Sequence, residues 1–201
     1  MPQRLGILGG TFDPIHYGHL IIAQEAADAL HLDSVLFLPA AIQPLKRGRR
    51  TTPASARLAM IERAIADNPR FQISRADLDH PGVSYTVDTL ARLRAAWGPD
   101  AAFWFIIGED SLANLLAWRD PAGIIAQTRL AVAPRPAVQV PWPRLDAALP
   151  ALRDCIDPVP APLIAISATD LRARVAAGRT IRYLVPPAVE AYIAEHELYR
   201  Q

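Results

Sequence analysis

One stretch near the start of the chain, residues 4–20, constrains the fold more than any other. It reads Arg-Leu-Gly-Ile-Leu-Gly-Gly-Thr-Phe-Asp-Pro-Ile-His-Tyr-Gly-His-Leu. The apolar run at residues 5–8 is typical of a buried strand, and it stops at Gly9 and Gly10 before a helical pattern begins. Glycines at such a junction let the backbone approach an anion, and the first helical N–H groups point at that anion. The stretch therefore predicts a strand–turn–helix unit that cradles phosphate.

Two histidines stand where this helix is expected to begin. His16 and His19 are three positions apart, so their rings lie on one side of the first turn. A single histidine here would more often be only a helix cap. Together with Asp13 the pair could also bind a metal, but no further His or Cys cluster completes such a site. Neither the G-x-G-x-x-G nor the G-x-x-x-x-G-K-[ST] pattern is present, so the combination of glycines and histidines carries the prediction of a site.

The composition is that of one domain with a buried core. The 201 residues are 51% hydrophobic and 20% charged, and the net charge of +1 provides no general attraction for nucleic acid. Cys155 is the only cysteine, which excludes an internal disulfide. No signal-peptide pattern is present, and no apolar run approaches the ~18 residues of a membrane span. We therefore expect a cytoplasmic protein that binds neither nucleic acid nor a membrane.

Strands and helices are predicted to alternate along the chain. Strand-like apolar runs and helical periodicity follow one another, with strands at residues 34–38, 71–74, 101–107, 130–133 and 163–166, helices at 18–30, 53–68, 85–97, 168–177 and 186–198, and a weaker helix at 142–153. This alternation predicts a Rossmann-like α/β fold with a doubly wound, mainly parallel sheet, in which 101–107 is central. We expect residues 1–162 to form the core. Residues 163–201 should add a phosphate-binding strand–helix and a small C-terminal helical lobe of the same domain.

Ligands of parallel sheets bind beyond the carboxyl ends of the strands. Gly108 follows the run 101–107 as Gly9 and Gly10 follow 5–8, so we expect one shared cleft. A second phosphate-binding candidate is the helix start at 167–172, which contains Ser, Thr and Arg. The hydroxyls there could be simple N-caps. A helix N-terminus that also carries a forked cation can equally hold phosphate, and beside the first element this is the favoured interpretation.

Three further segments could have either a purely structural role or a role in ligand binding. The cations at 46–50 are either a solvated loop or a cover for a triphosphate. The helix start at 84–90 offers several possible caps. Trp118 is either a core residue or part of a binding site.

Taken together, these motifs resemble the bacterial nicotinate-nucleotide adenylyltransferases, a family of the nucleotidylyltransferase superfamily. The superfamily signature is the element Gly-Gly-Thr-Phe-Asp-Pro-x-His-x-Gly-His at residues 9–19. The segments 84–90 and 107–112 are similar to motifs that separate the family from its superfamily relatives. The resemblance runs nearly the full length of the chain, through 167–172 to Arg-Tyr-Leu-Val-Pro at 182–186.

The resemblance implies that the adenylyl group of ATP is transferred to nicotinate mononucleotide, which yields deamido-NAD and pyrophosphate. ATP and nicotinate mononucleotide are then the binding partners, and Mg²⁺ is carried by the ATP phosphates and not by a protein cage. It implies catalytic roles for His16, His19, Arg172 and Lys46, ATP contacts for Gly9, Gly10, Thr11, Phe12, Gly108, Asp110, Ser167 and Thr169, and acceptor contacts for Tyr85, Thr86, Trp118 and Arg119. Many members carry Pro-x-Lys or Pro-His-Lys in the basic loop; here Lys46 is followed by Arg47, and the two remain alternatives.

Two other functions compete with this one. A phosphopantetheine adenylyltransferase would share the His-x-Gly-His element but would not need Trp118 or the segment 84–86. A module that senses ATP without turnover would not need His16, His19 and Arg172 together. Nothing in the chain resembles an activated nucleophile, so a covalent intermediate is not expected.

Overall fold

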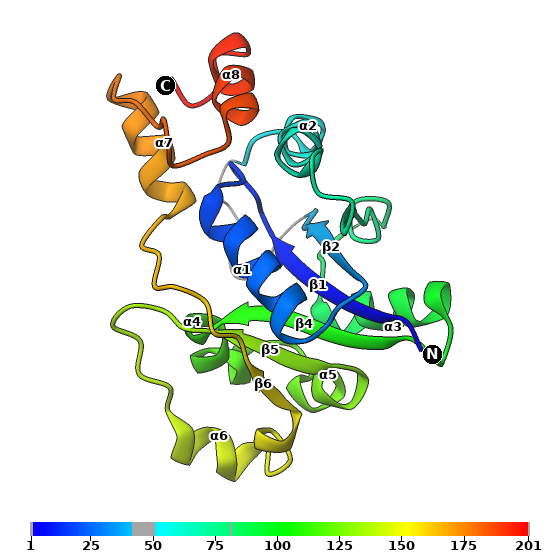
Figure 1. Cartoon of the computed structure of the whole chain (residues 1–201). Coiled ribbons are helices and arrows are strands. Elements are labelled where there is room, and N and C mark those ends of the chain that lie inside the picture. The colour runs from blue at the N-terminus through cyan, green and yellow to red at the C-terminus, as the bar shows by residue number, and fades with distance from the viewer. Residues whose placement is uncertain (1, 42–50, 81, 201) are drawn as a thin grey trace.

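A single parallel sheet organises the computed structural model, which describes residues 2–41, 51–80 and 82–200. Within these residues the sheet has six strands in the order β3-β2-β1-β4-β5-β6, and each neighbouring pair is parallel (Figure 1). The strands are β1 (Arg4–Gly10), β2 (Ser34–Pro39), β3 (Phe71–Ile73), β4 (Ala102–Gly108), β5 (Arg129–Ala133) and β6 (Ile156–Pro158). The order confirms a central position for β4. From β1 the strands β2 and β3 are added on one side, and from β4 the strands β5 and β6 are added on the other. The strand order therefore reverses between β1 and β4, and ligands of such sheets bind in the crevice beyond the carboxyl ends of the strands at this switch point.

Helices cover both faces of the sheet, which confirms the Rossmann-like, doubly wound prediction. One face packs against α1 (Tyr17–Ala29), α2 (Ala54–Ile65), α7 (Ala168–Ala176) and α8 (Pro187–Glu195). The other packs against α3 (Thr86–Trp97), α4 (Glu109–Ala113), α5 (Pro121–Gln127) and α6 (Trp142–Ala148), with short 3₁₀ turns at η2 (Leu115–Ala117) and η3 (Arg153–Cys155). Among the described helices, none combines the length and the apolar character that a membrane crossing requires.

The apolar strands explain these two cores. Successive side chains of a strand point to opposite faces, so Ile7 of β1 joins one core and Leu8 the other. Both are almost fully buried, as a strand covered on both faces requires. Position 6 requires glycine, because a Cβ there would come within 3.2 Å of side-chain atoms of Leu32, Val35 and Ile106.

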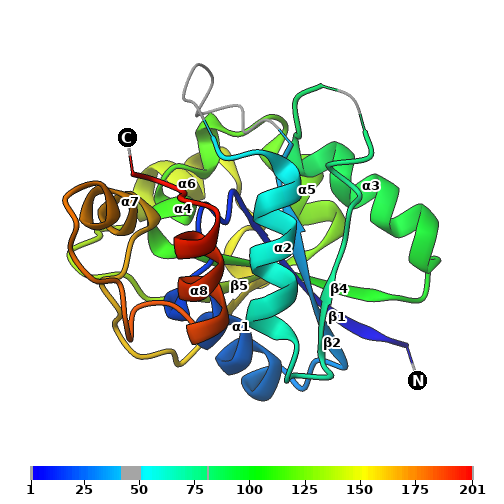
Figure 2. The same ribbon diagram turned by 90° about the horizontal axis from the view of Figure 1, so that it is seen from above.

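The C-terminal helices belong to the same core as the first half of the chain. Helix α8 lies alongside α2 in both views (Figures 1 and 2), and Arg63 of α2 covers the ring of Tyr192 with its guanidinium 4.5 Å from the ring centre. Val189 and Leu171 are buried in the cluster that also contains Met60. The proposed boundary at residues 162–163 stays a prediction.

The strand predicted at 163–166 is wrong. The last strand is β6, which the sequence analysis missed, and the segment that follows it does not join the sheet. Prolines at 158, 160 and 162 remove the N–H groups that a further ladder would need. The segment is apolar for another reason, because Ile164 and Ile166 line the ligand cleft while Leu163 is 64% exposed.

Candidate active site

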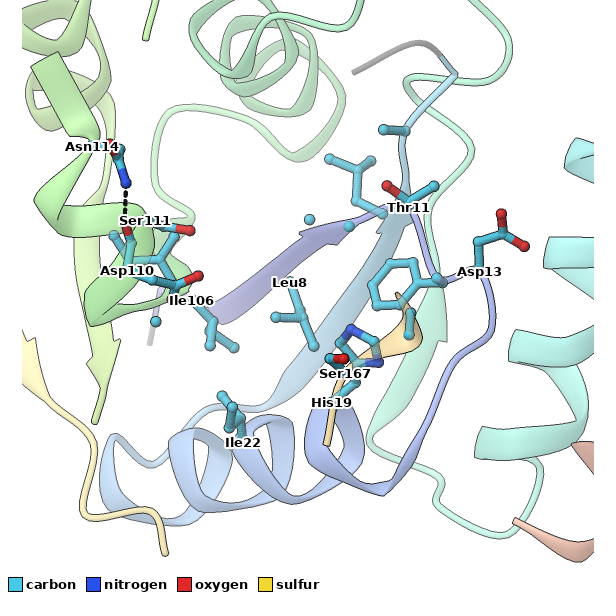
Figure 3. A pocket seen from close by; sticks show the side chains of 18 of the residues that line it. Leu8, Thr11, Asp13, His19, Ile22, Ile106, Asp110, Ser111, Asn114 and Ser167 are labelled. Carbon is cyan, nitrogen blue, oxygen red and sulfur yellow. Dashed lines mark hydrogen bonds between the residues drawn. The ribbon is translucent and has the colours of Figure 1, made fainter. Parts of the chain in front are cut away.

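A cleft of about 1270 Å³ opens at the carboxyl ends of β1 and β4, at the switch point of the sheet. Figure 3 shows an apolar floor made by Leu8, Ile22 and Ile106. Helix α4 forms one wall of the cleft. The opposite wall, here called the phosphate wall, consists of the turn after β1 (residues 11–16), the start of α1 and the start of α7.

The cleft brings together every predicted site residue that the structure describes. These residues come from five separate segments of the chain, because the carboxyl ends of parallel strands meet at one edge of the sheet. They are Gly9, Gly10, Thr11, Phe12, His16, His19, Tyr85, Thr86, Gly108, Asp110, Trp118, Arg119, Ser167, Thr169 and Arg172. Lys46 and its alternative Arg47 lie outside the described residues.

The turn after β1 has an unusual backbone at Phe12. Its φ of 51° lies in the left-handed region, which costs a non-glycine residue about 1 kcal/mol or more. The ring is buried against Phe37 and meets the edge of His19, with ring centres 5.8 and 5.0 Å away. A Cβ on Gly10 would lie only 3.1 Å from this ring. Glycine at position 10 therefore lets the phenyl group pack under the turn, and that packing offsets the strain.

The two histidines stack at the start of α1, as their spacing predicted. The ring centres of His16 and His19 are 3.7 Å apart, with 25° between the ring planes. The backbone N–H of His16 donates to Nδ1 of His19 at 3.3 Å. A neutral His19 therefore carries its proton on Nε2 and can donate from that atom. Gly18 leaves room for the pair, since a Cβ there would sit 3.0 Å from Nδ1 of His16.

His16 is held in its neutral form. The residue is only 4% exposed, and burial lowers its pKa to about 4, with a further contribution from the positive charge of Arg135. Its Nδ1 atom is buried and has no hydrogen-bond partner among the described residues. A neutral imidazole with an unused polar atom is suited to hydrogen bonding with a ligand that enters the cleft.

The helix start at α7 meets the turn after β1. Ser167 caps this helix, because its Oγ accepts the N–H of Asp170 at 3.1 Å. This confirms that the Ser167 hydroxyl is an N-cap. Arg172, one turn further on, donates from Nη1 to the carbonyl oxygen of Asp13 at 2.6 Å and from Nη2 to Oγ1 of Thr169 at 3.4 Å. The two predicted phosphate elements are thus in direct contact through Arg172.

The wall formed by α4 contains an ion pair that the sequence analysis missed. Nε of Arg135 lies 3.4 Å from Oδ1 of Asp110, and the backbone N–H of Arg135 donates to Oε2 of Glu109 at 2.9 Å. A Cβ on Gly108 would overlap both Asp110 and Arg135, so glycine is required for this close approach. Asn114 donates to the carbonyl oxygen of Asp110 at 2.8 Å, as the dashed line in Figure 3 shows. Arg135 lies two positions beyond the end of β5, so the rule that ligands bind at carboxyl strand ends could have identified it.

The far end of the cleft contains the residues predicted for the acceptor. Trp118 is half-buried and meets Phe105 edge-on at 6.0 Å, so it is both a packing residue and a wall of the cleft. Arg119 covers the ring of Tyr85 at 4.7 Å and pairs with Asp88 at 3.2 Å. This pair is largely exposed, so it contributes little to stability, and Arg119 can exchange partners at small cost.

Asp77 is a second residue of the cleft that the sequence analysis missed. Its buried carboxylate accepts a short hydrogen bond from Thr89 and pairs with Arg92 at 3.0 Å. These bonds fix the start of α3. Among the described residues, no three His, Cys, Asp or Glu side chains gather as metal ligands would.

The fold and the cleft define an α/β nucleotidyltransferase, and residues 7–174 match the family model described as cytidylyltransferase-like. The chain is 52% identical over 198 residues to a probable nicotinate-nucleotide adenylyltransferase of Thermomicrobium roseum, with 98% of this chain and 92% of the relative covered. It is 48% identical over 196 residues to a protein of the same description from a Roseiflexus species, with 98% of each covered. The chain therefore belongs to the nicotinate-nucleotide adenylyltransferase family, which confirms the resemblance read from its motifs.

A solved structure has the same fold. It is a nicotinic acid mononucleotide adenylyltransferase of Plasmodium falciparum complexed with NaAD, and it superimposes with a TM-score of 0.80 over 98% of both chains. The sequence identity is 18%, so this likeness concerns the architecture alone.

Proposed function

We propose that the protein transfers the adenylyl group of ATP to nicotinate mononucleotide, with deamido-NAD and pyrophosphate as products. The observation that carries this proposal is the arrangement of the cleft. The histidine pair and Arg172 lie on one wall, and the aromatic and cationic pair Trp118 and Arg119 lies at the far end. Membership of the adenylyltransferase family supports the same assignment.

The reaction needs alignment more than acid–base chemistry. An oxygen of the mononucleotide phosphate attacks the α-phosphorus of ATP in line. A new P–O bond forms while the bond from the α-phosphorus to the bridging oxygen breaks, and pyrophosphate leaves with that electron pair. The attacking phosphate is already an anion, so no strong base has to generate it. Positioning and stabilisation of the transition-state charge are the contributions a protein can make to such a step.

The phosphate wall supplies donors of several kinds. Neutral His16, Nε2 of His19 and the N–H groups of the turn after β1 can donate to the α-phosphate region. Arg172, together with the hydroxyls of Ser167 and Thr169, can hold the β- and γ-phosphates. We assign the remaining cation to Lys46 or Arg47. The ATP ribose is assigned to Asp110, whose carboxylate can accept from hydroxyl groups once Arg135 shifts.

The far end of the cleft suits a nicotinate ring. Its pyridinium is a cation, and the face of an indole attracts a cation by about 0.5–2 kcal/mol, so we assign the ring to Trp118. Its carboxylate is assigned to the N–H groups at the start of α3, near Thr86, and to Arg119. A carboxylate and an amide present different hydrogen-bonding groups at this point, so these donors can discriminate nicotinate from nicotinamide.

We propose that Mg²⁺ enters with ATP. The acidic side chains of the cleft already have protein partners, since Asp77 pairs with Arg92 and Asp110 with Arg135. These residues do not form a ready cage for the ion, and Mg²⁺ keeps several waters when it rides on phosphates. The cytoplasmic location stays a prediction.

Pyrophosphate release from ATP with a panel of acceptors tests the proposal. We expect turnover with nicotinate mononucleotide, and a kcat/KM at least ~10²-fold lower with nicotinamide mononucleotide. The reason is that a buried donor left facing an amide N–H costs about 1–3 kcal/mol, and the charge-assisted bond is lost as well. Turnover with phosphopantetheine alone would indicate the sister activity. ATP binding without turnover on any acceptor would indicate a sensing module.

A further inference from the structure

The C-terminal segment returns to the turn that carries the phosphate site. Tyr199 lies beyond α8, and its hydroxyl donates to Oδ1 of Asp13 at 2.6 Å, across 186 positions of sequence. Tyr199 has a left-handed φ of 65°, and burial together with the neighbouring carboxylate raises the pKa of its hydroxyl. The phenol therefore stays protonated and acts as a donor to Asp13.

Asp13 belongs to the wall of the cleft, but its side chain is buried within that wall. It is 4% exposed, and Figure 3 shows its carboxylate directed away from the cavity, on the opposite side of the turn from His19. Its second oxygen, Oδ2, accepts the backbone N–H of Thr52 at 3.1 Å. A buried carboxylate is costly unless donors satisfy both of its oxygens. Tyr199 supplies one of these two bonds.

Arg57 holds the same turn from a third direction. It is only 2% exposed, and burial lowers the pKa of its guanidinium while the charge of Asp13 opposes that shift. Its Nη1 donates to the carbonyl oxygen of Thr11 at 2.8 Å, and its Nε donates to that of Thr52 at 3.1 Å. The side chains of Tyr199 and Arg57 thus fix the turn through hydrogen bonds to Asp13 and to the carbonyl of Thr11.

The carbonyl of Asp13 connects this support to the phosphate wall. It accepts the 2.6 Å hydrogen bond from Nη1 of Arg172. The side chain and the carbonyl belong to one residue, so a rotation of Asp13 that followed loss of the Tyr199 bond would also move the acceptor of Arg172. Displacements of about 1 Å in a catalytic group can cost about 10²-fold in rate.

We propose that Tyr199 is a positioning residue for adenylyl transfer: its hydrogen bond to Asp13 fixes the turn after β1 and thereby aims Arg172 at the polyphosphate of ATP. The proposal rests on the function proposed above. It places a specific requirement on the last turn of the chain, which lies outside every motif that predicted the site.

The test is Tyr199→Phe, which keeps the half-buried ring and removes only the hydroxyl. We expect circular dichroism to be unchanged, kcat/KM for ATP to fall about 10-fold, and KM for the mononucleotide to stay within about twofold, as befits a loss of alignment at one wall of the cleft. Tyr192→Phe is the matched control, because that tyrosine lies in α8 and its ring stacks on His196 at 4.0 Å, away from the turn. The control should behave like the parent.

A double-mutant cycle with Asp13→Ala isolates the pair. Once the carboxylate is absent, Tyr199→Phe should cause no further loss, since contacting residues are not additive. Additive losses, parental kinetics of Tyr199→Phe, or an equal loss for both substrates would each overturn the proposal. Equilibrium binding of ATP without acceptor gives a readout independent of turnover, and its Kd should also rise about 10-fold in Tyr199→Phe. An inactive parent would refute adenylyl transfer, and this binding measurement would still decide the role of Tyr199.

Discussion

The buried ring of His16 makes the stability of the protein depend on pH in a defined direction. Its pKa is lowered from the ordinary 6.5 to about 4 in the folded protein, because burial and then the charge of Arg135 disfavour the imidazolium. In the unfolded chain the ring regains its ordinary pKa and binds a proton first. The stability that the neutral ring contributes is therefore complete above pH 6.5 and is lost as the pH falls toward 4.

The size of the effect follows from these two pKa values. Each pH unit between them shifts the free energy of unfolding by up to about 1.4 kcal/mol. Because protonation of the unfolded ring is only beginning at pH 7, the loss between pH 7 and pH 5 should be about 2 kcal/mol from His16 alone. That is a large fraction of the stability of an ordinary domain, so the effect should be easy to measure.

Urea unfolding of the parent and of His16→Gln at pH 7 and pH 5 measures this term. Every other titrating group is shared, so the drop in unfolding free energy should be about 2 kcal/mol smaller in the variant than in the parent. The glutamine keeps a polar side chain but cannot titrate. An equal drop in both proteins would refute the argument. A proton NMR titration in which the His16 ring changes charge near pH 6.5 would refute it as well.

Three substitutions test the assignment of the cleft. His19→Ala should leave circular dichroism unchanged and lower kcat at least ~10²-fold, as removal of a transition-state donor does, and near-parental turnover would remove this histidine from the mechanism. Arg172→Lys should lower kcat/KM for ATP about 10-fold, since one ammonium cannot replace the fork that donates to both Asp13 and Thr169 and that we propose to hold the phosphates; parental use of ATP would contradict that. Trp118→Ala should raise KM for both mononucleotides about 10-fold through the lost cation–π contact while ATP binding stays nearly constant, and a selective loss of ATP binding would contradict it.

Much of the fold could be predicted because buried parallel strands are continuous apolar runs. The runs at 5–8 and 101–107 became β1 and β4, and the positions of α1, α2, α3, α7 and α8 followed from their apolar stripes. The bounds of the short helices α4 and α5 were not predicted, because fewer than eight residues give too little of a helical period. The same reasoning went wrong at 163–166. An apolar segment can face a ligand cleft instead of a sheet, and the periodicity of a short segment does not distinguish the two. The actual edge strand, β6, has only three residues and includes Asp157 and Pro158, so it lacks the strand signal altogether.

A residue of the cleft could be predicted from the sequence where it lies at the carboxyl end of a recognised parallel strand. Gly108 ends a strand that was recognised, Asp110 follows it, and parallel strands end at one edge of the sheet. Arg135 also lies just beyond a recognised strand, so the same rule could have placed it near the cleft, but no motif marks it, and its pairing with Asp110 is seen only in the structure. Asp77 lies in a loop, where the direction of a side chain has no period from which it could be predicted.

Asp13 illustrates what a motif by itself leaves open. It stands three positions before His16 in the most informative stretch of the chain, and from the sequence it could have bound a metal together with the two histidines. The backbone of the turn is irregular, with a left-handed Phe12, so the two kinds of side chain leave it on opposite sides. The histidines line the cleft, whereas the carboxylate is bound from behind by Tyr199, which comes from the other end of the chain. Donors for a phosphate are useful only if their backbone is fixed, and a fixed, irregular backbone needs buried partners of its own. One short motif can therefore encode both the surface that meets the ligand and the anchor that holds it, and only tertiary contacts separate the two.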